Sequence, residues 1–150
     1  MSTVLTGNDT IKINDRVFAD FGHGEIAKIS YANQIAAVKK GRNGNAIVSS
    51  NQSGDQATLE LRVLRGSSDD KWLNSEIQKY KGNPDSYVLM SGEITKRLGD
   101  GKGNVTSDAE ILAGGVILQL PEKMTNVEGD VEQAITVYTI EFAQGNRALA

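Results

Sequence analysis

The 150-residue chain contains no cysteine, and this absence excludes several chemistries at once. Disulfide frameworks, thiolate metal sites and cysteine nucleophiles are all ruled out. Histidine is nearly as scarce: His23 is the only one, so a histidine-based metal site or a Ser-His-Asp triad has little to build on. Because His23 lies between two glycines, beside Glu25, and no G-x-S-x-G segment accompanies it, we interpret it as a turn residue.

Aromatic residues, long apolar runs and excess positive charge are also missing. Aromatics make up 5% of the chain, which is a small supply for a ligand pocket. No segment approaches the roughly 20 apolar residues of a membrane span, and the N-terminal MSTVLTGNDTIK lacks the features of a signal peptide. The net charge of −3 argues against a general nucleic-acid binder. We therefore expect synthesis in the cytoplasm, no membrane partner, and one domain over 1–150 whose thin core leaves apolar surface for partners.

Most of the sequence that is present alternates with the period of β-strands. The strands expected from this alternation span 10–18, 25–31, 57–64, 87–98, 109–120 and 133–142. In ATLELRVL (57–64), apolar and polar residues alternate cleanly, whereas 109–120 and 133–142 are apolar on both faces, as expected of strands covered on both sides. Glycine-rich turns separate these runs, so the chain predicts a mainly β fold.

One segment has the helical period instead. In GSSDDKWLNSEIQKYKGNP (66–84), the apolar stripe consists of Trp72, Leu73, Ile77 and Tyr80. Ser67 and Asp70 approximate a capping box, and Asp69 and Asp70 suit the positive end of the helix dipole. Since Gly82-Asn83-Pro84 is a stop signal, we predict one amphipathic helix over about 68–80 that rests on a sheet.

The glycine-rich segment TKRLGDGKGNVTSD (95–108) raises the question of a phosphate or metal loop. A Walker-type loop requires a hydroxyl residue where Gly103 stands, and a dinucleotide loop opens a helix, whereas this segment opens another strand. Lys102 places a cation between Asp100 and Asn104, which disfavours calcium. We interpret the segment as a flexible hairpin tip, in which glycine reaches positive φ at little cost.

Clustered carboxylates offer the remaining support for catalysis. Adjacent Asp69 and Asp70 would point to different sides of a helix. The cluster in PEKMTNVEGDVEQ consists of Glu122, Glu128, Asp130 and Glu132. A metal site or a hydrolase with a dispersed acidic site is one alternative for it, and a solvated acidic loop is the simpler one. We expect no enzyme, no catalytic residue, no cofactor and no metal.

A long hairpin is expected over 33–56, because KKGRNGN (39–45) carries the strong turn signal Asn43-Gly44. Lys39, Lys40 and Arg42 make its tip basic. Nucleic-acid contact, a solvated turn and docking onto an acidic protein surface are the uses open to it.

Three phrases of the sequence resemble the tail tube proteins of contractile-tailed bacteriophages. They are VLRGSSDDKWLNSEI, YVLMSGEITKRLGDGKGNVTSDAEILAGGVI and NVEGDVEQAITVYTIEF, and the likeness runs from about Ala19 to the C-terminus. The resemblance implies two packed antiparallel sheets with one flanking α-helix, and sheets that join between subunits into a large barrel. It also implies hexameric rings that stack into the hollow inner tube beneath the tail sheath of the virion.

The same resemblance implies the partners. They are further copies of the chain, the tail sheath protein, the baseplate hub and tail terminator, and the tape measure protein and phage DNA that pass through the lumen. The tube of a phage-tail-like bacteriocin or secretion system is an alternative, and a small β-barrel ligand-binding module is an alternative of another class.

Elementary physics is compatible with a self-assembling tube. Open antiparallel sheets have unpaired edges that invite association, and closing the strands into a barrel removes these edges. Strand 57–64 is one candidate for an edge strand between subunits, and hairpin 33–56 is the candidate for contacts between stacked rings. A basic lumen would bind passing DNA, so Glu60, Glu93 and Glu141 are candidates for the channel surface.

Overall fold

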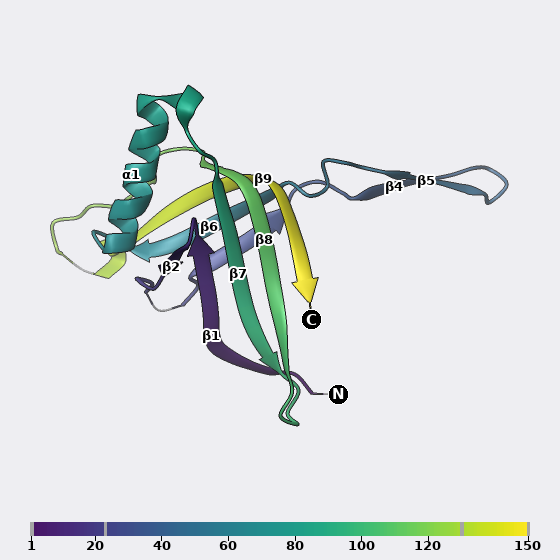
Figure 1. The fold of residues 1–150 in the computed structure, drawn as a ribbon, viewed down its shortest axis with the longest axis horizontal. Coiled ribbons are helices and arrows are strands. Elements are labelled where there is room, and N and C mark those ends of the chain that lie inside the picture. Colours follow the sequence, from purple (N-terminus) through teal and green to yellow (C-terminus); the bar gives the residue numbers. More distant parts are fainter. Residues whose placement is uncertain (1, 23, 130, 150) are drawn as a thin grey trace.

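The computed structural model describes residues 2–22, 24–129 and 131–149. The predictions made for His23 and Asp130 lie outside the described residues, as does the side chain of Glu132. The strands are β1 (Val4–Ile13), β2 (Arg16–Phe18), β3 (Ala27–Tyr31), β4 (Ala36–Lys40), β5 (Ala46–Ser50), β6 (Ala57–Leu64), β7 (Met90–Gly99), β8 (Val105–Ile117) and β9 (Ile135–Leu149). The helix α1 spans Ser68–Gly82, and short 3-10 turns span Pro84–Ser86 and Val131–Gln133. The predicted mainly β fold, with two antiparallel sheets and one flanking helix, is confirmed (Figure 1).

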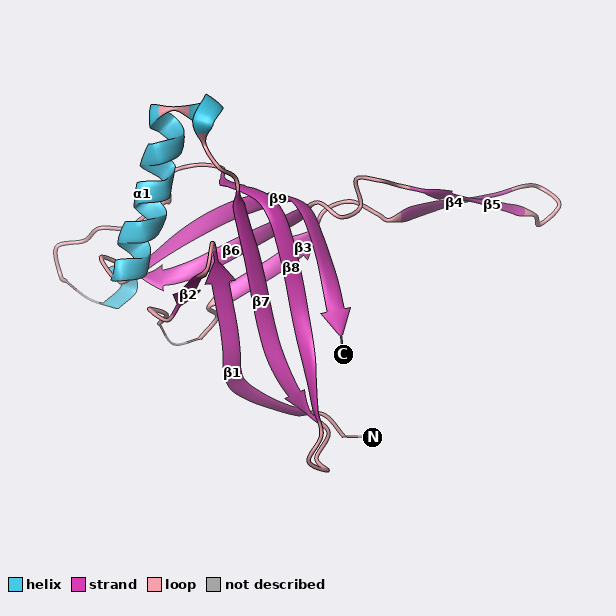
Figure 2. Ribbon diagram, in the orientation of Figure 1, coloured by secondary structure: helices cyan, strands magenta, loops and turns pink. Residues whose placement is uncertain are grey.

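Seven strands form one antiparallel sheet in the order β2-β1-β7-β8-β9-β6-β3, and β4 and β5 form a separate two-stranded sheet. The large sheet is not closed into a barrel within one chain, because β2 and β3 are its outer strands. Figure 2 shows that the sheet bends into two halves. One half contains β1, β7 and β8, the other contains β3 and β6, and the long β9 passes from one half to the other.

A bulge lies where the sheet bends. The pairing of β7 with β8 shifts its register between Met90 and Gly92, and Gly114 on β8 has a φ of +72°. On β9, the buried Phe142 is followed by the buried Gly145, an odd spacing that reverses which residues point inward. An extra residue of this kind bends the strand while keeping apolar side chains on the inner side.

The core lies inside the bend and beneath α1. Its side chains include Leu59, Leu61 and Val63 of β6, Tyr138, Ile140 and Phe142 of β9, Leu73 and Ile77 of α1, and Ile11, Ile13, Met90 and Leu112 from the other half of the sheet. Of the predicted helical stripe, Trp72 packs edge-on against Phe18 with ring centroids 5.7 Å apart. Tyr80 is exposed and packs against Tyr87. The Ser67 hydroxyl caps the helix by accepting a hydrogen bond from the Asp70 N–H at 3.2 Å.

Segment 10–18 is two strands and not the single strand that its alternation predicts. Asn14 and Asp15 both have positive φ, of 51° and 67°, and form a tight turn between β1 and β2. Asn and Asp tolerate the left-handed region because their short side chains bond locally. Because of this turn, Val17 does not share the buried face of Ile11 and Ile13 as a single alternating strand would require. Val17 is 58% exposed, and Phe18 is buried instead.

Two further predictions about strands are wrong. β6 lies between β3 and β9, so segment 57–64 is not an edge strand of this sheet. β8 is covered on one face only, since Ile111 is 56% exposed and its neighbours Ala109 and Ala113 lie on the same open side. Apolar residues on both faces of 109–120 therefore do not mean burial on both faces within one copy.

Candidate assembly interface

The glycine-rich segment is the tip of the β7–β8 hairpin. Asp100 organises this tip: its Oδ1 accepts hydrogen bonds from the backbone N–H groups of Lys102 and Asn104, at 2.7 and 3.1 Å. Gly101 and Gly103 adopt positive φ, at 79° and 92°. The hydrogen bonds from Asn104 and Lys102 lower the pKa of the Asp100 carboxyl. The carboxylate therefore stabilises the turn that the sequence predicts, with its acceptors already used by the loop itself.

Of the four clustered carboxylates that suggested catalysis, the structure describes the side chains of Glu122 and Glu128. Glu122 and Glu128 are exposed in the loop between β8 and β9. Within residues 2–22, 24–129 and 131–149, no group of three or more His, Asp or Glu side chains is placed to hold a metal ion. Nor is any helix in that part of the chain long and apolar enough to cross a membrane.

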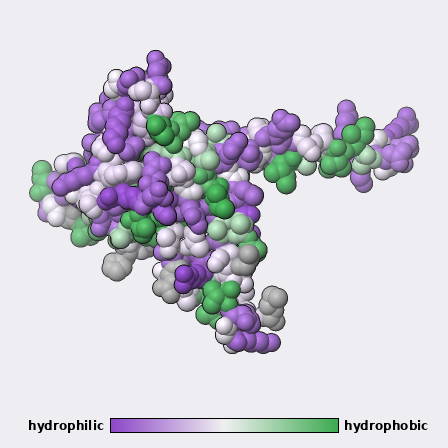
Figure 3. Space-filling model, viewed as in Figure 1, coloured by the Kyte–Doolittle hydropathy of each residue, from purple (hydrophilic) through white to green (hydrophobic). Residues whose placement is uncertain are grey.

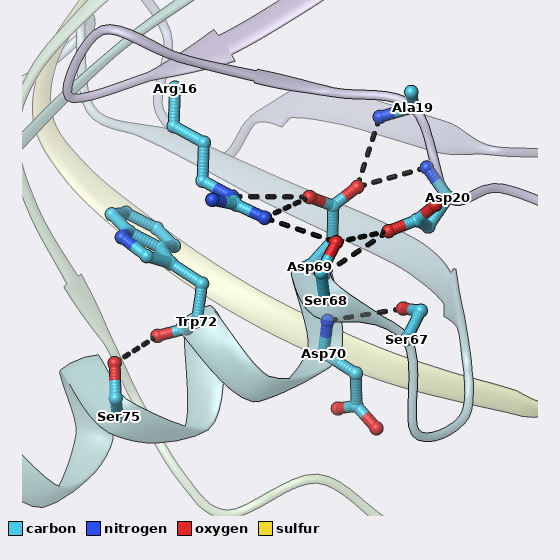
Figure 4. A network of polar contacts seen from close by, with 9 residues as sticks. All are labelled: Arg16, Ala19, Asp20, Ser67, Ser68, Asp69, Asp70, Trp72 and Ser75. Atoms are coloured by element: carbon cyan, nitrogen blue, oxygen red, sulfur yellow. Dashed lines mark hydrogen bonds and ion pairs between the residues drawn. The ribbon is translucent and has the colours of Figure 1, made fainter.

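A dense polar cluster joins the start of α1 to β2 and to the two residues that follow it (Figure 4). Oδ1 of Asp69 accepts hydrogen bonds from the Arg16 guanidinium at 2.9 and 3.1 Å, and its Oδ2 accepts from the N–H groups of Ala19 and Asp20, each at 2.9 Å. Asp20 in turn accepts a hydrogen bond from the Ser68 hydroxyl at 2.8 Å. Both carboxylate oxygens of Asp69 are fully used, so we interpret the cluster as a lock that positions the helix.

The remaining candidates for contact with another copy are the two outer strand edges of the half-sheet β1-β7-β8-β9. β2 pairs only with Ile11–Ile13 of β1, so among the described residues Val4–Thr10 has no strand on the side away from β7. At the other edge, β6 ends its pairing with β9 at Phe142, and 143–149 continues beyond it. The Gly145 N–H donates to the Asp55 carbonyl at 2.7 Å, and no strand among the described residues pairs with β9 beyond Gly145 on that side. Unpaired strand edges are templates for association with another chain.

These two edges run in opposite directions. β1 is antiparallel to β7, β7 to β8, and β8 to β9, so the β1 edge and the β9 edge of the half-sheet are antiparallel to each other. A second copy rotated about an axis along the strands would place its β1 beside β9 of the first copy in antiparallel orientation. The antiparallel hydrogen-bond pattern of the sheet can therefore continue from one copy to the next.

The open face of this half-sheet is polar and of mixed charge. Glu93 lies directly opposite Lys12 on β1 and Ile111 on β8, and Arg97 lies opposite Ser107. Of the predicted channel carboxylates, only Glu93 lies on this face. Glu60 and Glu141 lie on the other half of the sheet, where Glu60 pairs with Arg62 at 3.0 Å and Glu141 accepts a hydrogen bond from Gln56.

Charges on the opposite side of the same strands neutralise one another. Lys96 pairs with Asp9 at 3.0 Å, and Arg147 pairs with Asp108 at 2.8 Å. The hydrogen bond from Arg147 lowers the pKa of the Asp108 carboxyl. These pairs link β1 to β7 and β8 to β9, so they hold the half-sheet together at the end that extends past the core.

The predicted hairpin is an arm, which we define as residues 35–50 and which projects from the body (Figure 3). β4 and β5 pair with Val38 opposite Val48 and Lys39 opposite Ile47, and every residue of the arm is exposed. The turn closes with the Gly41 N–H bonded to the Asn45 carbonyl at 2.6 Å and with Gly44 at a φ of 91°. Neither sheet face of the arm is covered by its own chain.

The sequence did not reveal the edges that β1 and β9 supply. The alternation in VLTGND is weak because Thr6, Gly7 and Asn8 interrupt it, and AQGNRAL after Phe142 reads as a polar tail. Both become strands because β7 and β8 pair with them. As a result β9 runs for 15 residues, far beyond an ordinary strand and beyond the segment 133–142 that alternation predicted.

No protein-family model matches the chain, and no curated protein matches it in sequence. In fold it is similar to the sheath/tube terminator of an extracellular contractile injection system (PVC) in the extended state, at 14% identity and a TM-score of 0.52. That match covers 97% of this chain and 96% of the other. A chain of the anti-feeding prophage (AFP) baseplate, from a six-fold symmetrised reconstruction, matches at 11% identity and a TM-score of 0.49, over 100% of this chain and 97% of that chain. At such identities the similarity to the terminator shows a shared fold.

Proposed function

We propose that this chain is a structural subunit of a contractile-tail particle, in which hexameric rings enclose a channel and stack into the inner tail tube. The observation that carries the proposal is the half-sheet β1-β7-β8-β9, whose two unpaired edges are antiparallel to each other. Each copy would contribute these strands to a shared barrel, and closing the ring would pair the β1 edge of every copy with the β9 edge of its neighbour.

An even number of strands makes the closure self-consistent. With four strands per copy, direction alternates throughout the ring, and every junction between copies is the same β9-to-β1 contact. A cyclic assembly uses one such heterologous contact repeatedly, so a single interface suffices. The hexameric number follows from the resemblance of the three sequence phrases to phage tail tube proteins.

The open face of the half-sheet supplies the channel surface in this proposal. Lys12, Glu93 and Arg97 alternate in sign there, so the lumen carries no continuous basic track. Passing DNA would then release few counterions at each ring and slide without strong binding. The same wall would contact the tape measure protein, and the outer surface would meet the sheath and, at the ends, the baseplate hub and terminator.

A terminator ring is the second candidate, because the terminator of an injection system shares this fold over nearly the whole chain. A terminator closes a tube with one ring, whereas a tube subunit must stack on itself. The arm, exposed on both faces, favours stacking, so we place the tube first. A bacteriocin or secretion tube would use the same contacts, and in every case the role needs no catalysis or cofactor.

Electron microscopy of the concentrated protein tests the proposal. Tube subunits form rods with an open channel, a terminator forms single rings, and a ligand-binding module remains a monomer. Because the chain has no cysteine, paired cysteines can report the ring contact directly. We would combine Gly7→Cys on the β1 edge with Gln144→Cys, Asn146→Cys or Ala148→Cys on β9, and oxidise each double variant.

Adjacent strands bring Cα atoms to about 4.5–5.5 Å, which fits a disulfide. We expect at least one pair to yield a ladder of covalent oligomers that ends at the closed ring. The matched control joins Gln78→Cys, on the exposed surface of α1, to Ala148→Cys, and should give no ladder. A monodisperse monomer with no ladder from any pair would refute the proposal.

A further inference from the structure

The loop between β8 and β9 covers 118–134, and its described residues, 118–129 and 131–134, are joined to one another and to Arg65 by hydrogen bonds although they carry little regular structure. Arg65, just after β6, donates to the Met124 carbonyl at 2.8 Å, to the Gln133 carbonyl at 3.4 Å and to the Thr125 hydroxyl at 3.2 Å. The Asn126 N–H also donates to the Gln133 side chain at 3.2 Å. Arg65 and the bond between Asn126 and Gln133 thus hold the two described parts of the loop together.

This organised loop presents apolar side chains to solvent. Val127 is 100% exposed, Val131 is 85% exposed and Met124 is 49% exposed. Single exposed apolar residues are common, but several on one ordered loop mark a contact surface. Glu122 and Glu128 are exposed beside them, and the segment 118–134 contains four acidic residues against one lysine. The surface is thus apolar and acidic together.

The arm has the complementary character. Ile35, Val38, Ile47 and Val48 are each 64–75% exposed. Lys39, Lys40 and Arg42 lie around its turn, and residues 35–50 contain no acidic residue. Apolar area and opposite charge thus match between the arm and the loop.

The arm cannot reach the loop of its own chain. Figure 1 shows the arm at one end of the longest axis and the loop, in light green, at the opposite end. Two complementary surfaces at opposite ends make a head-to-tail contact between copies, which repeats without closing on a pair. Since the β9-to-β1 contact already closes the ring in the proposed function, we assign this second contact to copies in different rings.

We propose that loop 118–134 is the acceptor for the arm of a second copy, with the apolar side chains of the arm on Met124, Val127 and Val131. The basic turn of the arm lies against Glu122 and Glu128. The contact joins copies in successive rings, and in that respect it rests on the proposed function. Apolar burial supplies the affinity and the charge pairs set orientation, so the contact weakens as salt rises.

Reversing the charges of the arm and of the loop tests the contact, and the length of the assembled rods is the quantity measured. Lys39→Glu/Lys40→Glu should leave rings intact but weaken stacking roughly tenfold, because like charges then face each other. Combining it with Glu122→Lys/Glu128→Lys should restore long rods, and Val127→Asp alone should abolish them. The control Lys71→Glu/Lys81→Glu makes the same charge change on exposed positions of α1 and should stack normally.

A second readout does not depend on rings. Val48→Cys and Val127→Cys proteins are mixed and oxidised, and we expect the mixed disulfide dimer in excess over either homodimer. If it forms while no rings are seen, the ring proposal fails and the docking stands. If rings form but the mixed dimer does not, or if the swapped variants stack as wild type, the docking is refuted and the loop serves another partner such as a sheath.

Discussion

The Arg16 guanidinium and the Asp69 carboxylate, 53 positions apart in the sequence, meet at 2.9 Å and fasten the first turn of α1 to the start of β2. Asp69 is 2% exposed, and its second oxygen accepts two backbone N–H groups from the segment after β2. This contact holds the helix over the core and also fixes the strand that ends one edge of the sheet.

Asp69→Ala should lower the free energy of unfolding by about 3 kcal/mol, because it leaves Arg16 and two backbone N–H groups without their acceptor. The half-buried position of Arg16 allows water to compensate in part, which keeps the loss at the low end of the range for buried pairs. Denaturant unfolding measures the change. Glu25→Ala, at an exposed carboxylate, is the control and should change stability by less than about 0.5 kcal/mol. Equal effects of the two substitutions would show that the lock contributes nothing.

Gly115→Ala should destabilise the fold by about 1–3 kcal/mol, since a methyl group there would lie 2.4 Å from Cε1 of Phe142. Phe142 is fully buried and cannot move freely. The double variant Gly115→Ala/Phe142→Leu should be more stable than the sum of the two single effects, as a double-mutant cycle would measure.

Gly7→Ala is the matched control, because nothing lies within 4 Å of the added methyl group. It should leave the unfolding midpoint nearly unchanged. Simple additivity of Gly115→Ala and Phe142→Leu would contradict the packing described at the bend.

Alkaline titration should find Tyr138 resistant to ionisation. Burial, followed by its hydrogen bond to Asp70, raises the pKa of Tyr138 well above the usual 10.0. Because the folded protein favours the neutral phenol, this contribution to stability is complete below pH 10.0 and declines as the pH rises above 10.0. Phenolate absorbance followed against pH, compared with Tyr138→Phe, measures it.

The Tyr138→Phe variant should lose one late-titrating phenol and show a shallower fall in stability above pH 10.0. Loss of an early-titrating phenol in this variant would show that Tyr138 is accessible to water.

Arg147→Pro should block assembly, whereas Arg147→Ala should not. The Gly145 N–H points to the open side of β9, and alternation along the strand puts the Arg147 N–H on that side too. Both substitutions remove the ion pair with Asp108, but only proline removes the backbone donor. We expect the concentration needed for assembly to rise at least about tenfold for proline, the equivalent of ~1.4 kcal/mol per contact. Sedimentation measures it, and normal assembly of the proline variant would show that β9 is not the joining edge.

The sequence predicted local structure well where one residue type decides it. Ser67 caps the start of α1, Asn43-Gly44 lies in the turn of the arm, and alternation located β6 residue for residue. It failed at Asn14-Asp15, where an apolar pattern continued through a turn, and at β6, where alternation cannot distinguish a central strand from an edge.

The sequence by itself determined the class of the protein: a cysteine-free, mainly β chain with one capped helix and a basic hairpin, because alternation, capping and turn signals act over a few residues. Only the tertiary structure decided which strands are open, because edges depend on the pairing of segments far apart in the chain. Val4–Thr10 and 143–149 look like polar termini in sequence, yet pairing with β7 and β8 makes them the two borders at which another copy can join.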